Sequence, residues 1–351
     1  MLKMVQKSLA AVSKPTQTYE PGDGSRLLLL PYGARVLGLC TARSDENFFW
    51  TNPVLEFPDS ARRLFSEKGS NDTGGGRTWL APELDLFFPG YPDTSRHVRP
   101  QQLDGVPYEV LHKHDRLGLI RRMSLYVARS FRDVEVELVR WFEPAPQPLR
   151  REPQWASQVA AVQYAGYTQR TILSFMGDSV RKPVPIGVWN LVQLPHGGEL
   201  LVPTYARTQP RLLSGEIPAD RLTCEDRVVR FKTDFAGEHR IAIRAASATG
   251  RAGYFRRTGD TSSLVVCNFL VNPSGEYVDV PKDDPKDLGY SVQALNVLNA
   301  TGAYCELAFH SPAISQLEGV TSVTDVSQLW AFRGPSEPVQ TIARALLGVA
   351  P

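Results

Sequence analysis

Apolar and polar residues alternate along much of this chain. In the stretch 133–138, Asp-Val-Glu-Val-Glu-Leu, every second side chain is apolar, which is typical of a half-buried strand. Similar runs, many bounded by Gly, Pro, Asn or Asp, predict strands at 26–31, 34–40, 122–130, 158–167, 170–176, 186–194, 198–203, 227–233, 239–245, 263–272, 289–298, 303–309 and 329–333. The number of strands predicts an all-β fold, a large antiparallel two-sheet sandwich with few short helices.

Helical spacing of apolar residues is confined to two windows, 59–67 and 339–349. Stretches rich in Pro and Gly at 70–76, 143–153 and 281–288 are too short to be flexible interdomain linkers, so we interpret them as loops or strand crossovers. We therefore expect an N-terminal tail over 1–20 and a single β domain over 21–351.

The composition supports a folded chain without a nucleic-acid or membrane partner. Hydrophobic residues make up 42% of the 351 positions, enough for a sizeable core. The net charge is +2, and the basic residues are scattered, so no nucleic-acid footprint is visible. The apolar runs fall short of the roughly 20 residues that cross a bilayer, and no export signal is visible. Four widely spaced cysteines without a CxxC pair are typical of reduced structural thiols and favour a cytoplasmic protein: Cys40, Cys224, Cys267 and Cys305.

The first segment with candidate chemistry is 71–83. Three glycines at 74–76 permit unusual backbone angles just before Arg77, Trp79 and Glu83. An arginine that donates paired hydrogen bonds and a tryptophan face that packs on ring C–H groups suit a sugar. The alternative is a tight turn with a structural Arg77–Glu83 ion pair. The spacing of a phosphate-binding loop is absent.

The second segment, 187–204, has the pattern of a strand, a tight turn and a returning strand. Trp189 and Gln193 share one face of the first strand, where the glutamine amide could bond a ligand. His196 follows in the turn and could donate a proton near neutral pH. The alternative for His196 is an exposed turn residue.

The third segment, 302–312, is a strand whose alternation separates two sets of side chains. One face carries Tyr304, Glu306, Ala308 and His310, and the other carries Cys305, Leu307 and Phe309. If the second face is the core, Glu306 and His310 project on the same side. A carboxylate among aromatic rings can have a raised pKa and act as an acid or base. The alternative is an exposed strand face with two polar residues.

These three segments resemble the galactose mutarotase-like superfamily, the relatives of aldose 1-epimerase. The motifs are GGxRTWxAPE at 74–83, WNxxQ at 189–193 and YxExxxHSP at 304–312, and the resemblance covers roughly 25–335. It implies a large two-sheet supersandwich with a concave sugar-binding face. It also implies that Glu306 is the general base and that Arg77 helps to hold the sugar.

The acid of that family does not carry over. The corresponding strand has Gln193, which cannot donate a proton at a useful pKa, with His196 three residues later. The leading hypothesis is a carbohydrate-binding protein, with anomeric interconversion as its enzymatic form. In that form Glu306 would act with His310 or His196. We expect the substrate to be bound by Arg77, Trp79, Glu83, Trp189, Gln193 and Tyr304.

Two other functions remain open. One is a non-catalytic sugar sensor that uses the same cleft. The other is a relative of glycoside hydrolases or lyases, for which Glu83 and Glu306 would be the two carboxylates. No cofactor is expected, and the His112/His114 pair has no third ligand at metal-binding spacing, so no metal site is expected. The oligomeric state is not indicated by these patterns.

Overall fold

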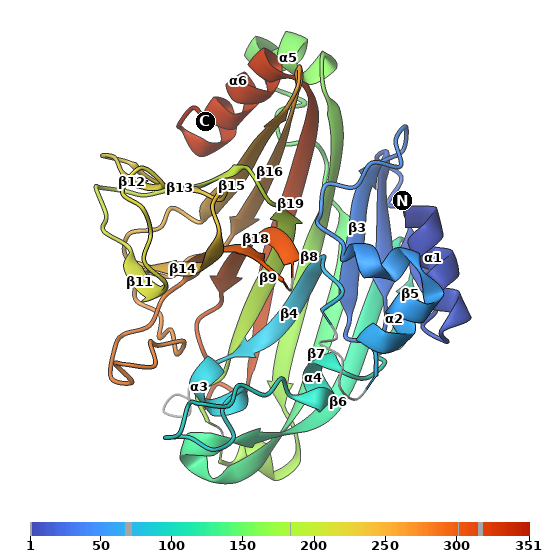
Figure 1. The fold of residues 1–351 in the computed structure, drawn as a ribbon. Coiled ribbons are helices and arrows are strands. Elements are labelled where there is room, and N and C mark those ends of the chain that lie inside the picture. The colour runs from blue at the N-terminus through green and yellow to red at the C-terminus, as the bar shows by residue number, and fades with distance from the viewer. Residues whose placement is uncertain (1, 67–71, 183, 301, 315–318) are drawn as a thin grey trace.

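Two large antiparallel sheets form the framework of the molecule (Figure 1). The computed structural model describes residues 2–66, 72–182, 184–300, 302–314 and 319–351. Strands account for 45% of the structure and helices for 17%, whereas globular proteins average about 20–25% strand. The predicted all-β, two-sheet antiparallel architecture with few short helices is confirmed.

One sheet has nine strands and the other has ten. The nine-stranded sheet runs, in spatial order, β1 (Gln17–Tyr19), β2 (Ser25–Leu30), β3 (Arg35–Thr41), β4 (Gly76–Ala81), β9 (Gly187–Pro195), β18 (Gly302–His310), β17 (Val292–Asn299), β14 (Gly237–Ile243) and β11 (Arg211–Ser214). The ten-stranded sheet runs β12 (Leu222–Cys224), β13 (Val228–Lys232), β10 (Glu199–Pro203), β15 (Arg251–Thr258), β16 (Thr261–Phe269), β19 (Ser322–Pro335), β8 (Gln163–Phe175), β7 (Arg132–Pro144), β6 (Arg116–Val127) and β5 (Glu109–Lys113).

The main core lies between the two sheets. Phe309 of β18 stacks on Phe269 of β16, with ring centroids 4.5 Å apart, and Asn190 of β9 donates to Asp325 of β19 at 2.9 Å. Because side chains alternate along a strand, the neighbours of Phe309 and Asn190 point away from the ten-stranded sheet. We call that side of the nine-stranded sheet the outer face, and it carries Glu306.

The helices are short. They are α1 (Leu2–Ala11), α2 (Pro58–Leu64), α3 (Glu83–Leu86), α4 (Gln101–Asp104), α5 (Ala156–Ala160) and α6 (Ser336–Leu347), with 3₁₀ turns η1 (Pro53–Glu56), η2 (Ala128–Ser130), η3 (Pro153–Trp155) and η4 (Gly177–Val180). Helix α6 covers part of the ten-stranded sheet beside α5 (Figure 1). No helix in the described ranges is long and apolar enough to cross a membrane.

Several predicted boundaries differ from the structure. The described part of the segment 1–20, expected as a tail, forms α1 and β1, because Leu2, Val5 and Leu9 bury one side of the helix. The strands expected at 158–167 and 170–176 are one strand, β8, and the Ala- and Gln-containing stretch before it is helical. The helices expected at 59–67 and 339–349 correspond to α2 and α6, and residue 67 lies outside the described residues.

Candidate functional site

A row of side chains crosses four strands of the outer face. The antiparallel register pairs Arg240 of β14 with Leu295 of β17, and Leu295 with Glu306 of β18. Glu306 in turn pairs with Gln193 of β9. Residues directly opposite one another on neighbouring strands point to the same face. The register therefore brings Glu306, Gln193 and Arg240 together, and the first two are almost fully buried.

The first predicted segment joins the same face through β4. Trp79 pairs with Trp189 of β9, and Trp189 pairs with His310 of β18. Arg77 stands two residues before Trp79, so it points to the same side. Trp79 and Trp189 are only 5% and 1% exposed. These two indoles are therefore buried beneath the site and do not offer an exposed surface for stacking.

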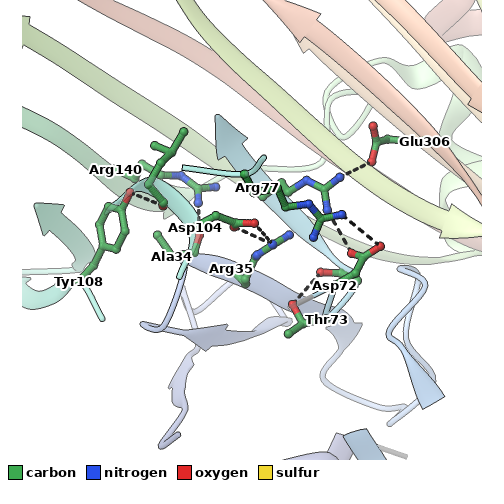
Figure 2. Close-up of polar contacts among 12 residues, drawn as sticks. Ala34, Arg35, Asp72, Thr73, Arg77, Asp104, Tyr108, Arg140 and Glu306 are labelled. Carbon is green, nitrogen blue, oxygen red and sulfur yellow. Dashed lines mark hydrogen bonds and ion pairs between the residues drawn. The ribbon is translucent and has the colours of Figure 1, made fainter. Parts of the chain in front are cut away.

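Arg77 bridges two carboxylates. Its Nη2 donates to Glu306 Oε2 at 2.9 Å, and its Nη1 donates to Asp72 Oδ1 at 3.2 Å, as Figure 2 shows. The Tyr304 hydroxyl lies 3.5 Å from Asp72 Oδ2, and Arg99 Nη2 lies 4.0 Å from the same oxygen. We call the three central residues the Asp72–Arg77–Glu306 cluster.

The glycine run before β4 sets the path of this segment. Gly74 and Gly75 have φ angles of +78° and +77°, a region that favours glycine. A Cβ on Gly74 would lie 2.5 Å from the carbonyl oxygen of Trp50, and one on Gly75 would overlap the carbonyl of Val36. The glycines therefore let the turn pack closely on two neighbouring segments. Asn71, at the start of the sequence segment, lies outside the described residues.

The two carboxylates of the cluster have pKa values shifted in opposite directions. Burial raises the pKa of Glu306, although Arg77 and Arg240 oppose the shift. Burial alone would raise the pKa of Asp72, but Arg77 and Arg99 hold it below its usual value. One guanidinium thus contacts an ionised carboxylate and a carboxylate that retains its proton to higher pH.

Glu83 takes part in a different set of contacts from the expected one. It accepts from Arg240 at 2.9 Å, and His97 Nε2 lies 3.4 Å from it. The Arg77–Glu83 ion pair is therefore wrong as an interpretation, since Arg77 points along the sheet to Glu306. The Glu83 backbone N–H donates to Asp279 at 2.8 Å. Glu83 and its contacts therefore form a second polar group, separate from the Asp72–Arg77–Glu306 cluster.

His310 is buried away from the cluster. Its ring stacks on Trp189, with centroids 5.2 Å apart, and Asp279 Oδ2 lies 3.9 Å from its Nε2. Burial lowers the pKa of His310 to about 3, so the imidazole is neutral at neutral pH. It stands four residues from Glu306, roughly 13 Å along a strand at about 3.3 Å per residue. The expected Glu306–His310 pairing in one reaction centre is not supported by this spacing.

His196 follows the end of β9. Its Nε2 is buried without a hydrogen-bond partner among the described residues, and no contact joins it to Arg77 or Glu306 in that part of the chain. Pro195 pairs with Tyr304, so by alternation it lies on the outer face, and His196 comes one position later. The turn therefore separates His196 from the cluster.

Sequence patterns missed the charged residues that complete the site. Asp72 and Arg99 come from loops, Arg240 comes from β14, and Asp279 comes from an irregular segment. None lies in the three motifs. Asp72 does lie inside the first segment, 71–83, directly before the Thr-Gly-Gly-Gly run, and this position was the available signal. Across the described residues, no group of three His, Cys, Asp or Glu side chains is arranged to hold a metal ion.

A concavity of about 740 Å³ lies elsewhere on the molecule. Its lining includes Arg129, Arg244, Tyr277 and Leu288, and it contains no member of the Asp72–Arg77–Glu306 cluster. Within the cluster, Arg77 and Glu306 are each 5% exposed, and Asp72 is partly buried.

Comparison with known proteins gives a family and distant structural neighbours. The model of the Family of unknown function (DUF6786) matches residues 9–350. No curated protein matches the sequence. A candidate aldose 1-epimerase from Escherichia coli K12 has 10% identity and a TM-score of 0.47, covering 91% of this chain and 99% of that one. A galactose mutarotase related enzyme from Lactobacillus acidophilus has 9% identity and a TM-score of 0.44, covering 91% and 97%. A galactose 1-epimerase from the same species has 10% identity and a TM-score of 0.43, covering 91% and 94%.

Proposed function

The chain belongs to the Family of unknown function (DUF6786), and we propose that its Asp72–Arg77–Glu306 cluster binds a carbohydrate. The observation that carries this proposal is the bridging of two carboxylates by Arg77, above a floor that includes Trp79. Two carboxylates accept hydrogen bonds from sugar hydroxyls, and guanidinium groups donate to them.

Because Arg77 and Glu306 are each 5% exposed and already contact one another, a sugar must replace part of these internal contacts in order to bind. A monosaccharide that replaces these internal contacts gains little net free energy. We expect affinities near the millimolar range, about 4 kcal/mol.

The experiment is ligand-observed NMR and calorimetry with a panel of monosaccharides and sugar phosphates. We expect the wild type to bind at least one of them and Arg77→Gln to bind it at least roughly tenfold more weakly. Arg122→Gln is the matched control, because Arg122 also pairs with a glutamate, at 2.7 Å, but on an exposed strand surface. Absence of binding by the folded wild type, or equal binding by both variants, would count against the proposal.

A second candidate, anomeric interconversion, is favoured by the opposite pKa shifts of Asp72 and Glu306. Groups whose pKa values are driven apart in one site are suited to acid and base roles. Asp72 would take the proton of the anomeric hydroxyl while Glu306 protonates the ring oxygen and the ring C–O bond breaks. On closure to the other anomer Glu306 takes that proton back and Asp72 returns the other. In this scheme Glu306 is the acid of ring opening, whereas the resemblance implies that it is the base.

The non-catalytic sensor remains the alternative, because Gln193 occupies the position where the resemblance places an acid. A hydrolase or lyase role for Glu83 with Glu306 gains no support, since Glu83 is held by Arg240 and lies beside His97.

A further inference from the structure

A small apolar group lies on the outer face beside the cluster. Leu295, Val297 and Tyr304 are buried in it, and Trp50, which packs against them, is only partly buried. The Trp50 and Tyr304 rings have centroids 4.5 Å apart and an interplanar angle of 30°. Leu295 is the cross-strand partner of Glu306. The aromatic pair therefore adjoins the proposed sugar site on the same face.

The position of Trp50 is fixed by its backbone. Its N–H donates to the carbonyl of Gln193 at 3.0 Å, and its carbonyl accepts from Gly75 at 2.8 Å. A Cβ on Gly302 would lie 3.3 Å from Cζ2 of the indole, so the glycine leaves room for the ring over β18. The same Gly-Gly turn that leads into Arg77 thus also holds Trp50.

We propose that Trp50 and Tyr304 form a second subsite, which stacks a sugar ring next to the ring held by the Asp72–Arg77–Glu306 cluster. The inference rests on the proposed function and extends it to a substrate class, a reducing disaccharide or longer oligosaccharide. Tyr304 and Glu306 are two residues apart on one strand, about 7 Å, which accommodates one ring beside the next. The partly exposed Trp50 ring receives the C–H side of the second ring, and the buried Tyr304 ring packs against it.

Asp72 connects the two subsites. The Tyr304 hydroxyl lies 3.5 Å from its Oδ2, while Arg77 contacts its Oδ1. A carboxylate at this junction accepts hydrogen bonds from hydroxyls of both rings, because each oxygen has two lone-pair directions. A partly exposed indole, packed on a buried tyrosine ring and beside a polar cluster, is the composition expected for binding a ring that is apolar on one side and polar at its edge.

The test compares the affinities of lactose and maltose with those of galactose and glucose, by calorimetry and ligand-observed NMR. For the wild type we expect one of the disaccharides to bind at least roughly tenfold more tightly than either of its component sugars. Trp50→Ala should remove that difference and leave monosaccharide affinity unchanged. Trp155→Ala is the matched control, because Trp155 is also partly buried but packs beside α6 on the other sheet.

The possible outcomes separate the second subsite from the proposed function. Equal affinities for disaccharides and monosaccharides in the wild type would overturn the second subsite and leave the proposed function standing. The second subsite is also overturned if Trp50→Ala weakens the binding of both ligand classes equally. No binding of any sugar would contradict the proposed function itself. If Trp50→Ala does not fold, Trp50→Phe, which keeps a smaller ring, should reduce the disaccharide preference. The ratio of disaccharide to monosaccharide affinity in the wild type tests the second subsite without any variant.

Discussion

Arg77 and Glu306 are 229 positions apart in the chain, and their side chains meet at 2.9 Å from Nη2 to Oε2. The contact crosses from β4 to β18 with β9 between them. Their side chains are 5% and 7% exposed, so the pair is held where water cannot readily replace either partner. This contact unites the first and third motifs of the sequence in one site.

Removing the arginine should destabilise the protein. Arg77→Gln leaves Asp72 and Glu306 without their shared counter-charge, and breaking a buried ion pair in this way costs about 3–5 kcal/mol. Arg122→Gln breaks the exposed pair with Glu137 and should cost less than about 1 kcal/mol. Urea denaturation of both variants measures the difference, and equal losses would contradict the structural role of Arg77.

Glu306→Gln tests the enzymatic form of the proposal. It keeps the shape of the side chain but removes its titration, so the rate of anomer interconversion should fall by roughly 10²–10⁴, as for other general acid–base groups. Polarimetry on freshly dissolved α-glucose and α-galactose measures the rate. An equally active variant would show that Glu306 is not the titrating group. If neither protein is faster than buffer, anomeric interconversion of these two sugars is excluded.

Asp325 should make stability depend on pH. Burial raises its pKa to about 6, opposed by the hydrogen bond from Asn190, whereas an unfolded aspartate has a pKa of about 3.9. The folded state therefore binds more protons between pH 4 and 6, and the free energy of unfolding falls as pH rises through that window. Two pKa units correspond to roughly 3 kcal/mol.

Asp325→Asn should remove this dependence. Subtracting the variant's free energy of unfolding from that of the wild type cancels the titration of the other carboxylates. The difference should decline between about pH 4 and pH 6 and then level off. Denaturation curves measured at pH steps across this range supply the comparison. A constant difference would contradict the assigned pKa shift.

The glycine turn before β4 should be intolerant of a side chain. Gly75→Ala places a Cβ against the Val36 carbonyl at a φ of +77°. Gly197→Ala has a similar φ of +90°, but its Cβ would meet no atom within 4 Å, so it should show only the backbone strain, about 1–2 kcal/mol. We expect Gly75→Ala to lower stability by at least about 2 kcal/mol more. Equal melting temperatures for the two variants would contradict the close approach.

Alternation in the sequence predicted which side chains share a face but not which strands are neighbours. The period of two placed Glu306 and His310 on one side of a strand, and the structure agrees. It could not show that four residues of extended chain separate them too widely for one reaction centre. The pairing of Arg77 with Glu306 depends on the register of three strands distant in the sequence, which local patterns do not encode.

The sequence patterns did not predict the remaining site residues, for a different reason. Asp72 and Arg99 come from loops, and loops carry no periodicity. Trp50 comes from a short segment after β3, whose position is set by hydrogen bonds to Gln193 and Gly75. The N-terminal helix α1 was missed because its short apolar stripe was interpreted as part of a tail.

A crystal structure after soaking with a panel of monosaccharides and disaccharides would show directly whether a sugar binds at the Asp72–Arg77–Glu306 cluster. We expect sugar density on the outer face, with hydroxyls within hydrogen-bond distance of Arg77, Glu306 and Asp72. Sugar bound only in the 740 Å³ concavity lined by Arg129 and Arg244, with the cluster unchanged, would contradict the proposed carbohydrate site.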